Sequence, residues 1–169
     1  MLQRLTLLAA LFWCTVLEAQ NRELLGEFKI GFVGRDQENV IYQAAQEGAQ
    51  AAALELSKKY SIDIEVVIYT PDKTLGGSQM NSLAELFIED ADGLIISPEN
   101  TEAVRASVNF ALQQGQEVVF FESQLSELES LTSVLADEVE AGRLAGRAIL
   151  AKLPTKARVA ILTSATPGA

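Results

Sequence analysis

The chain has 169 residues, of which 49% are hydrophobic and 21% charged, and its formal net charge is −10. This balance excludes a disordered chain and allows one globular domain with a buried core. The excess of carboxylates repels nucleic-acid phosphates and anionic lipids, and the lysines and arginines are scattered. We therefore expect no nucleic-acid partner.

Two residue types limit the chemistry of the chain. Histidine is absent, and Cys14 is the single cysteine. A Ser-His-Asp triad and histidine-based metal sites are therefore excluded, and we expect neither a metal nor a cofactor. Gly31 and Gly34 do not form the glycine pattern of a dinucleotide-binding loop. Acid-base catalysis by a carboxylate pair such as Glu122 and Asp137 is a minor alternative, and the main expectation is a protein that is not an enzyme.

The first residues have the pattern of an export signal. Residues 1–4 supply a positive charge, residues 5–17 are mostly apolar, and the small Ala19 follows. A helix that spans a bilayer needs about 20 apolar residues, so this run is too short. We expect a signal peptide over residues 1–19, cleaved at Ala19, and a periplasmic or extracytoplasmic protein.

The repeating pattern begins with an apolar run over residues 28–33, which predicts a strand. Residues 40–60 have helical spacing, and the predicted inward stripe consists of Ile41, Ala45, Gly48, Ala52 and Leu56. Small side chains in this stripe would let the helix lie close against a sheet. A second strand is expected over 64–69, and the next helix, with Ser78 as its N-cap, over 80–87.

The rest of the chain continues in the same way. In order, the pattern predicts a strand over 93–97, a helix over 101–114, strands over 118–121 and 133–136, a helix over 138–153 and a strand over 158–163. Gly115 is placed to end the first of these helices. The second helix has an apolar face made of Ala141, Leu144, Ala145, Ala148 and Ile149, which we expect to face the core.

Near-continuous apolar strands that alternate with helices predict an α/β domain, a doubly wound, Rossmann-like parallel sheet covered on both faces. Because the crossovers are right-handed, the loops after the strands emerge at one edge, where such folds bind ligands. The stretch "DGLIISPENTEAV", residues 92–104, illustrates the transition. Pro98 ends the strand, and Asn100 or Thr101 caps the following helix.

Polar residues follow each predicted strand, so we expect them to gather at that edge. They are hydroxyls, amides and carboxylates together with one arginine, Arg35. Such a surface suits a neutral polyol or a cationic ligand better than a phosphate.

Four stretches in order carry a family resemblance: "KIGFVGRDQENVIYQAAQEGAQ", "DGLIISPENTEAV", "GQEVVFFES" and "LADEVEAGRLAG". Together they resemble the N-terminal lobe of the type 1 periplasmic binding proteins, the ribose-binding and related sugar-binding family, from about Lys29 to Ala165. The resemblance implies the substrate-binding component of an ABC-type importer. Such a protein closes two lobes on a small polar solute, here expected to be sugar-like, and its partner is a membrane permease.

The resemblance also implies a set of ligand-binding residues. Asn39 and Tyr42 match an asparagine and an aromatic residue of the first loop, and Ser123 and Asp137 match positions after the fourth and fifth strands. Asp137 has an alternative role as the N-cap of the next helix. The predicted ligand set is Arg35, Asn39, Tyr42, Glu122, Ser123 and Asp137.

Three positions depart from the family pattern. Ile41 stands where another aromatic residue is common, Glu122 replaces an aspartate, and Glu138 replaces an asparagine. Aromatic rings stack on the apolar face of a sugar, so the first departure weakens the inference of a sugar ligand.

We expect residues 27–153 to form the N-terminal lobe, and residues 154–169 to be a crossover and the first strand of a second lobe that is largely missing. A truncated or split reading frame is the favoured explanation. The alternatives are a one-lobe protein that forms a homodimer through its exposed cleft and an exported remnant or interaction domain that binds no ligand. The ligand-sensing domain of a repressor shares this fold, but it would carry DNA-binding helices where this chain has an export-type segment.

Overall fold

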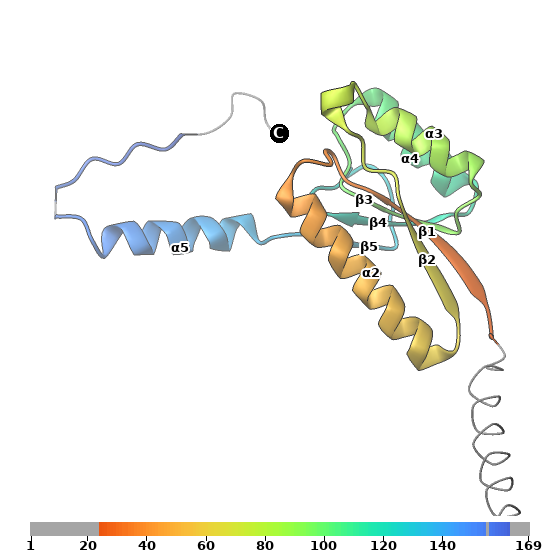
Figure 1. Cartoon of the computed structure of the whole chain (residues 1–169). Coiled ribbons are helices and arrows are strands. Elements are labelled where there is room, and N and C mark those ends of the chain that lie inside the picture. Colours follow the sequence, from red (N-terminus) through yellow and green to blue (C-terminus); the bar gives the residue numbers. More distant parts are fainter. Residues whose placement is uncertain (1–23, 155, 163–169) are drawn as a thin grey trace, which may run out of the picture.

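The computed structural model describes residues 24–154 and 156–162. Its centre is a five-stranded sheet in the order β2-β1-β3-β4-β5, with every neighbouring pair parallel (Figure 1). The predicted doubly wound α/β architecture is therefore confirmed. The predicted signal peptide lies outside the described residues.

The strands are β1 (Glu27–Val33), β2 (Asp63–Ile68), β3 (Gly93–Ile96), β4 (Glu117–Phe121) and β5 (Thr132–Val134). The helices are α2 (Val40–Tyr60), α3 (Gln79–Ile88), α4 (Glu102–Gln113) and α5 (Glu138–Leu150), with a short 3-10 turn, η1 (Lys73–Leu75). The predicted caps Ser78 and Thr101 accept hydrogen bonds from backbone N–H groups of α3 and α4. Gly115 follows α4 with a φ of 81°, in the left-handed region that favours glycine.

The predicted sixth strand is wrong over the part that the structure describes. Residues 158–162 have no strand pairing, and Ile161 and Leu162 are 89% and 97% exposed. A β-prone run becomes a strand only when a sheet edge lies within reach to accept its hydrogen bonds. Here the segment follows α5, which leads the chain away from the sheet (Figure 1).

One face of the sheet is fully buried over its central strands. Leu94 and Ile96 of β3 and Val118 and Phe120 of β4 are all at most 1% exposed, in one cluster with buried side chains of α3 and α4. Close packing reaches the backbone at Gly31, where an added Cβ would lie 1.9 Å from Leu86 Cδ1. This face therefore supplies most of the buried core.

The opposite face is only partly covered, because α2 packs against the β2 side of the sheet. Phe32 contacts the ring of Phe121 at 5.1 Å, and Phe121 contacts Tyr42 of α2 at 6.1 Å. Since successive strand residues point to opposite faces, Phe32 lies on the α2 face and Gly31 on the α3 face. On the α2 face Val119 stays half-buried.

The predicted inward stripe of α2 is shifted by about one residue. The buried residues of α2 are Tyr42 and Ala53, whereas Ile41 is 56% exposed and a Cβ added at Gly48 would meet nothing within 4 Å. Alanine and glycine occupy several neighbouring positions of this helix, so apolar spacing alone leaves the direction of its inward face poorly determined.

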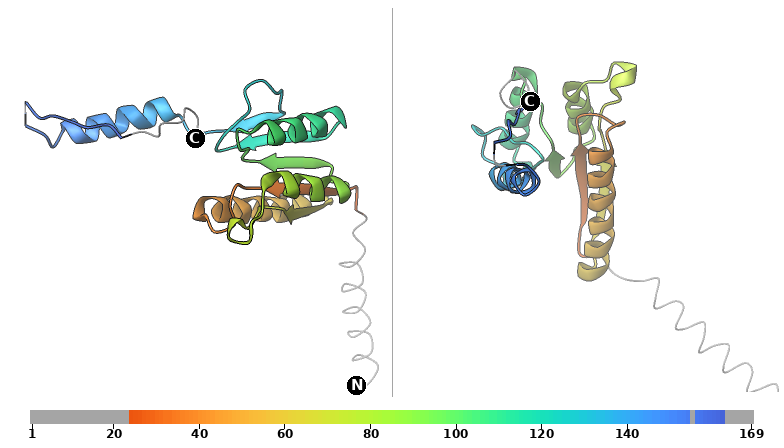
Figure 2. Two further views of the ribbon diagram at one scale, coloured as in Figure 1. Left: turned by 90° about the horizontal axis from the view of Figure 1, so that it is seen from above. Right: turned by 90° about the vertical axis from the view of Figure 1, so that its left-hand side faces the viewer.

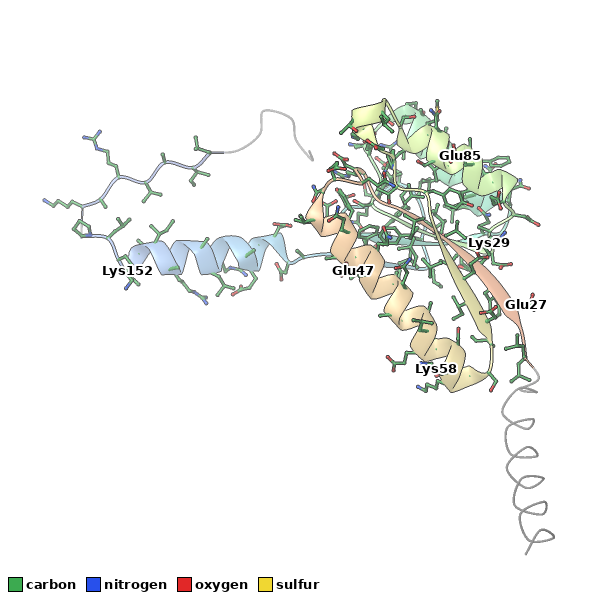
Figure 3. The ribbon with its side chains drawn as sticks, in the orientation of Figure 1. Glu27, Lys29, Glu47, Lys58, Glu85 and Lys152 are labelled. Carbon is green, nitrogen blue, oxygen red and sulfur yellow. The ribbon has the colours of Figure 1, made fainter. Side chains whose placement is uncertain are left out.

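The predicted core-facing side of α5 is wrong in this structure. Within the described residues α5 has no buried residue, and it makes no substantial contact with another helix or strand. Figure 2 shows it projecting beyond the sheet, and the labelled Lys152 just past its end in Figure 3 lies away from the sheet. Helical spacing identifies an apolar stripe, but it does not determine which surface covers that stripe.

Gly31 in β1 and Gly48 in α2 provide a matched test of packing. We expect Gly31→Ala to lower the free energy of unfolding by about 1–3 kcal/mol, because the new methyl group overlaps the fully buried Leu86 side chain. Gly48→Ala should raise it by up to about 1 kcal/mol, since the added Cβ enters open space in a helix. Urea denaturation of both variants measures the free energy of unfolding. If Gly31→Ala left that free energy unchanged, the packing of α3 on β1 would be contradicted.

Candidate functional site

The ends of β1, β3 and β4 meet at one edge of the sheet. Val33 pairs with Ile96, and Ile96 pairs with Phe120. The residues that follow these strands therefore lie close together although they are far apart in the sequence. They form a group that we call the edge cluster: Arg35, Tyr42, Ser97, Glu122 and Ser123.

The carboxylate of Glu122 is the centre of the edge cluster. Its Oε2 atom accepts a hydrogen bond from Ser97 Oγ at 2.6 Å and one from the Tyr42 hydroxyl at 3.5 Å. The Arg35 guanidinium forms an ion pair with the same oxygen at 3.5 Å. The Glu122 side chain remains 39% exposed, so solvent or a ligand can reach it.

Glu122 also has a strained backbone. Its φ is 62°, in the left-handed region that a residue with a side chain rarely adopts. The Glu122 N–H donates to Val134 O of β5 at 3.0 Å, which helps to fix this conformation. Such strain, of the order of 1–3 kcal/mol, is often found where a side chain is held for function.

A second group of contacts joins the loops after β3 and β4. Ser123 Oγ lies 3.2 Å from Ser97 Oγ and donates to Pro98 O at 3.1 Å. The same carbonyl accepts from Arg35 at 3.0 Å. The Nε atom of Arg35 is buried and has no hydrogen-bond partner among the described residues. The edge cluster is thus held together by its own contacts and keeps one unused donor.

Gln79, which was not among the predicted residues, joins the loops that follow β1 and β3. It is fully buried, and its Nε2 donates to Gly34 O at 2.9 Å and to Ser97 O at 2.7 Å. Its Oε1 accepts from Glu99 N at 2.7 Å. As the first residue of α3, a glutamine resembles any exposed helix-end residue in the sequence. Only the folded chain shows that it ties the exits of β1 and β3 together.

The structure places the other two predicted ligand residues at helix N-termini. Asn39 Oδ1 accepts from Ile41 N at 2.9 Å, and Asp137 Oδ1 accepts from Glu140 N at 2.8 Å. The capping alternative for Asp137 is therefore confirmed. Among the described residues, neither side chain is hydrogen-bonded to the edge cluster. Of the six predicted residues, the structure brings together Arg35, Tyr42, Glu122 and Ser123.

Burial raises the pKa of Tyr42 above its ordinary value of 10.0. The nearby Glu122 carboxylate acts in the same direction, while Arg35 opposes it. The phenol is therefore neutral at physiological pH and acts as a hydrogen-bond donor to Glu122.

Two other kinds of site are not found in the part of the chain that the structure describes. Residues 24–154 and 156–162 contain no group of three or more aspartate, glutamate, cysteine or histidine side chains arranged to hold a metal ion. None of the helices in these ranges has the length and hydropathy that a membrane span requires.

We expect Gln79→Leu to lower the free energy of unfolding by about 2–4 kcal/mol, because buried carbonyl and N–H groups would lose their partner. Gln113→Leu, at an exposed position of α4, should change it by no more than about 0.5 kcal/mol. Urea denaturation distinguishes the two. Equal stability of both variants would show that Gln79 does not hold the edge.

The raised pKa of Tyr42 predicts a dependence of stability on alkaline pH. Between pH 10 and the raised pKa of the folded state, the unfolded chain releases the phenol proton while the folded chain keeps it. The corresponding stability is complete below pH 10 and is lost as the pH rises through the folded pKa. Urea unfolding on either side of pH 10 should show a smaller loss for Tyr42→Phe than for the unchanged chain, and an equal loss would refute this assignment.

Comparison with known structures places the fold. The chain is similar to the periplasmic ribose ABC transporter of Conexibacter woesei, with 24% identity and a TM-score of 0.60, over 76% of this chain and 41% of that one. It is similar to an ABC transporter solute binding protein of Mycobacterium smegmatis with bound glycerol, with 25% identity and a TM-score of 0.60, over 77% and 42%. A putative LacI transcriptional regulator of Bacteroides fragilis shares the fold, with 14% identity, a TM-score of 0.59 and coverage of 74% and 43%. The chain thus spans less than half the length of each.

Sequence comparison identifies the family. No curated protein sequence matches the chain significantly. A family model described as a periplasmic binding protein domain matches residues 30–169, which include all of the edge cluster. The chain therefore belongs to the periplasmic binding protein domain family.

Proposed function

We propose that this chain provides a ligand-binding surface of the substrate-binding component of an ABC-type importer, and that its ligand is a small polar solute of the sugar class. The edge cluster carries this proposal. It gathers one carboxylate, three hydroxyls and a guanidinium at the edge where parallel α/β sheets bind ligands. Family membership and solved relatives described as sugar transport components support the same assignment.

The chemistry of the edge cluster suits hydroxyl groups. A sugar hydroxyl both donates and accepts, so it can donate to the exposed Glu122 carboxylate and accept from Arg35 or Ser123. Bonds to a charged group are stronger and more directional than bonds between neutral groups. A phosphate is less suitable, because the exposed Glu122 carboxylate would repel it.

Tyr42 has a positioning role in this proposal. It is only 6% exposed, and its ring packs edge-on against Phe121. The ring therefore has no free face on which a sugar could stack. Its hydroxyl instead donates to Glu122, so recognition on this surface depends on hydrogen bonds more than on aromatic stacking.

Asn39 and Asp137 remain candidates for ligand contacts at the rim. Each uses one side-chain oxygen as a helix cap. The amide nitrogen of Asn39 and the second carboxylate oxygen of Asp137 make no hydrogen bond among the described residues and would be free to meet a solute. The membrane permease as partner and export through residues 1–19 belong to the same proposal, as does a homodimer formed through the exposed edge.

The test is a titration of the purified chain with ribose, arabinose, glucose and galactose, followed by NMR shifts and calorimetry. We expect a Kd in the millimolar range, equivalent to about −4 kcal/mol, because a solute on one lobe keeps much of its surface in water. Glu122→Gln should weaken binding about tenfold or more, since it removes a charged acceptor.

Glu85→Gln is the matched control, because Glu85 lies on α3 at a distance from the edge (Figure 3). It should leave the affinity unchanged. Shifts that do not map to the edge cluster, or an affinity that Glu122→Gln does not alter, would contradict the proposed site. Micromolar affinity would show that this lobe needs no second surface.

A second candidate is an interaction domain that binds no small solute. One observation favours it: the sheet keeps an uncovered apolar area beside α2, which is unrelated to solute binding. Absence of any sugar response together with stable self-association would support this candidate.

A further inference from the structure

The α2 face of the sheet contains an apolar hollow of about 320 Å³, which we call the open half-face. Its floor includes Ile30, Ile95 and Val119 of three neighbouring strands, and its walls include Ala52 and Leu56 of α2. Nothing among the described residues covers it, although the reverse face of the same strands is buried below α3 and α4. An apolar sheet surface beside a packed helix is typical of a surface on which a second helix packs.

The helix α5 of the same chain lacks a surface to pack against. Its predicted apolar stripe is uncovered along its length, with Leu144 56% and Ile149 43% exposed. At 1.5 Å per residue, its 13 residues span about 20 Å, close to the length of a six-residue strand. The alanines at 141, 145 and 148 would allow close approach to the half-face.

Charge favours one orientation of α5 on the open half-face. A helix that follows a parallel strand starts at the carboxyl edge and runs antiparallel to the strands, so its end reaches their amino edge. Glu117, at the amino end of β4, is the carboxylate that lines the hollow there. The residues after α5 are basic at Lys152, Lys156 and Arg158. Docking would bring these opposite charges together.

The connection between β5 and α5 bears on which sheet is the partner. Only three residues, Leu135 to Asp137, separate Val134 from Glu138, and α5 points away from its own sheet (Figures 1 and 2). A short hinge favours exchange of an element between two copies, which makes the same contacts between chains.

We propose that two copies of this chain form a symmetric dimer in which each α5 covers the open half-face of the other copy. The contact is reciprocal, so it closes after two chains, and its short connections bring the carboxyl edges of the two sheets near each other. Its contacting surfaces are α5 and the open half-face, not the side chains of the edge cluster, and it does not depend on solute binding.

The first test is the mass of the full chain by light scattering and sedimentation over a wide concentration range. We expect twice the 18.3 kDa of one chain. Leu144→Glu should give a monomer, because it places a charge in the apolar stripe. Val139→Glu, on the opposite side of α5, is the matched control and should remain a dimer. A monomer for the unchanged chain, or a dimer that Leu144→Glu does not affect, would overturn the proposal.

Disulfide trapping identifies the surface that α5 covers. One chain carries Ala148→Cys and another Ala52→Cys, both with Cys14→Ser. Mixed and oxidised, they should form a disulfide between the two different chains, and Val139→Cys in place of Ala148→Cys should not. A chain with both cysteines that closes on itself and stays monomeric would show instead that α5 folds back onto its own sheet, which would refute the exchange.

Discussion

The parallel pairing of β1 with β3 and of β3 with β4 is the constraint on which the candidate site depends. Because of this pairing, the carboxyl ends of all three strands lie at one edge of the sheet, and Arg35, Ser97 and Glu122 meet there. Past the ends of β1 and β3 the strand pairing stops, and the side chain of Gln79 joins the two backbones instead. Its Nε2 atom donates to both Gly34 O and Ser97 O. This position therefore requires a glutamine, because any other side chain would leave several buried polar groups without hydrogen-bond partners.

The edge cluster combines internal order with access to solvent. Glu122 is held in a left-handed conformation, and three side chains direct polar groups at its carboxylate, which nevertheless stays partly exposed. A ligand can therefore meet a preorganised acceptor instead of ordering a mobile one, which reduces the entropy lost on binding. The chain belongs to the periplasmic binding protein domain family, and a solute-binding role at this edge is the function proposed above. Under the proposed function, the buried position of Tyr42 favours hydrogen bonds over aromatic stacking in the recognition of a solute.

The two faces of the sheet differ in how completely they are buried, and this difference sets the behaviour of the rest of the molecule. Leu94 and Val118 lose nearly all contact with water below α3 and α4, whereas Ile95 and Val119, on the same strands, line an open hollow. Burial of apolar surface is worth roughly 25 cal/mol per Å², so an open face and an uncovered helix stripe in one chain favour their association. Exchange of α5 between two copies would cover both at once.

The sequence by itself determined the order of elements, the parallel sheet, the caps Ser78 and Thr101 and the edge at which polar residues gather, because these follow from local periodicity, turn residues and the handedness of crossovers. It also predicted four of the residues that meet there. Only the tertiary structure decided that Gln79 braces the edge, that Glu122 is strained, that α2 turns a neighbouring stripe inward, and that α5 and residues 158–162 find no place on the sheet. Those outcomes depend on which surfaces meet across long sequence separations, and a local pattern contains no record of the partner.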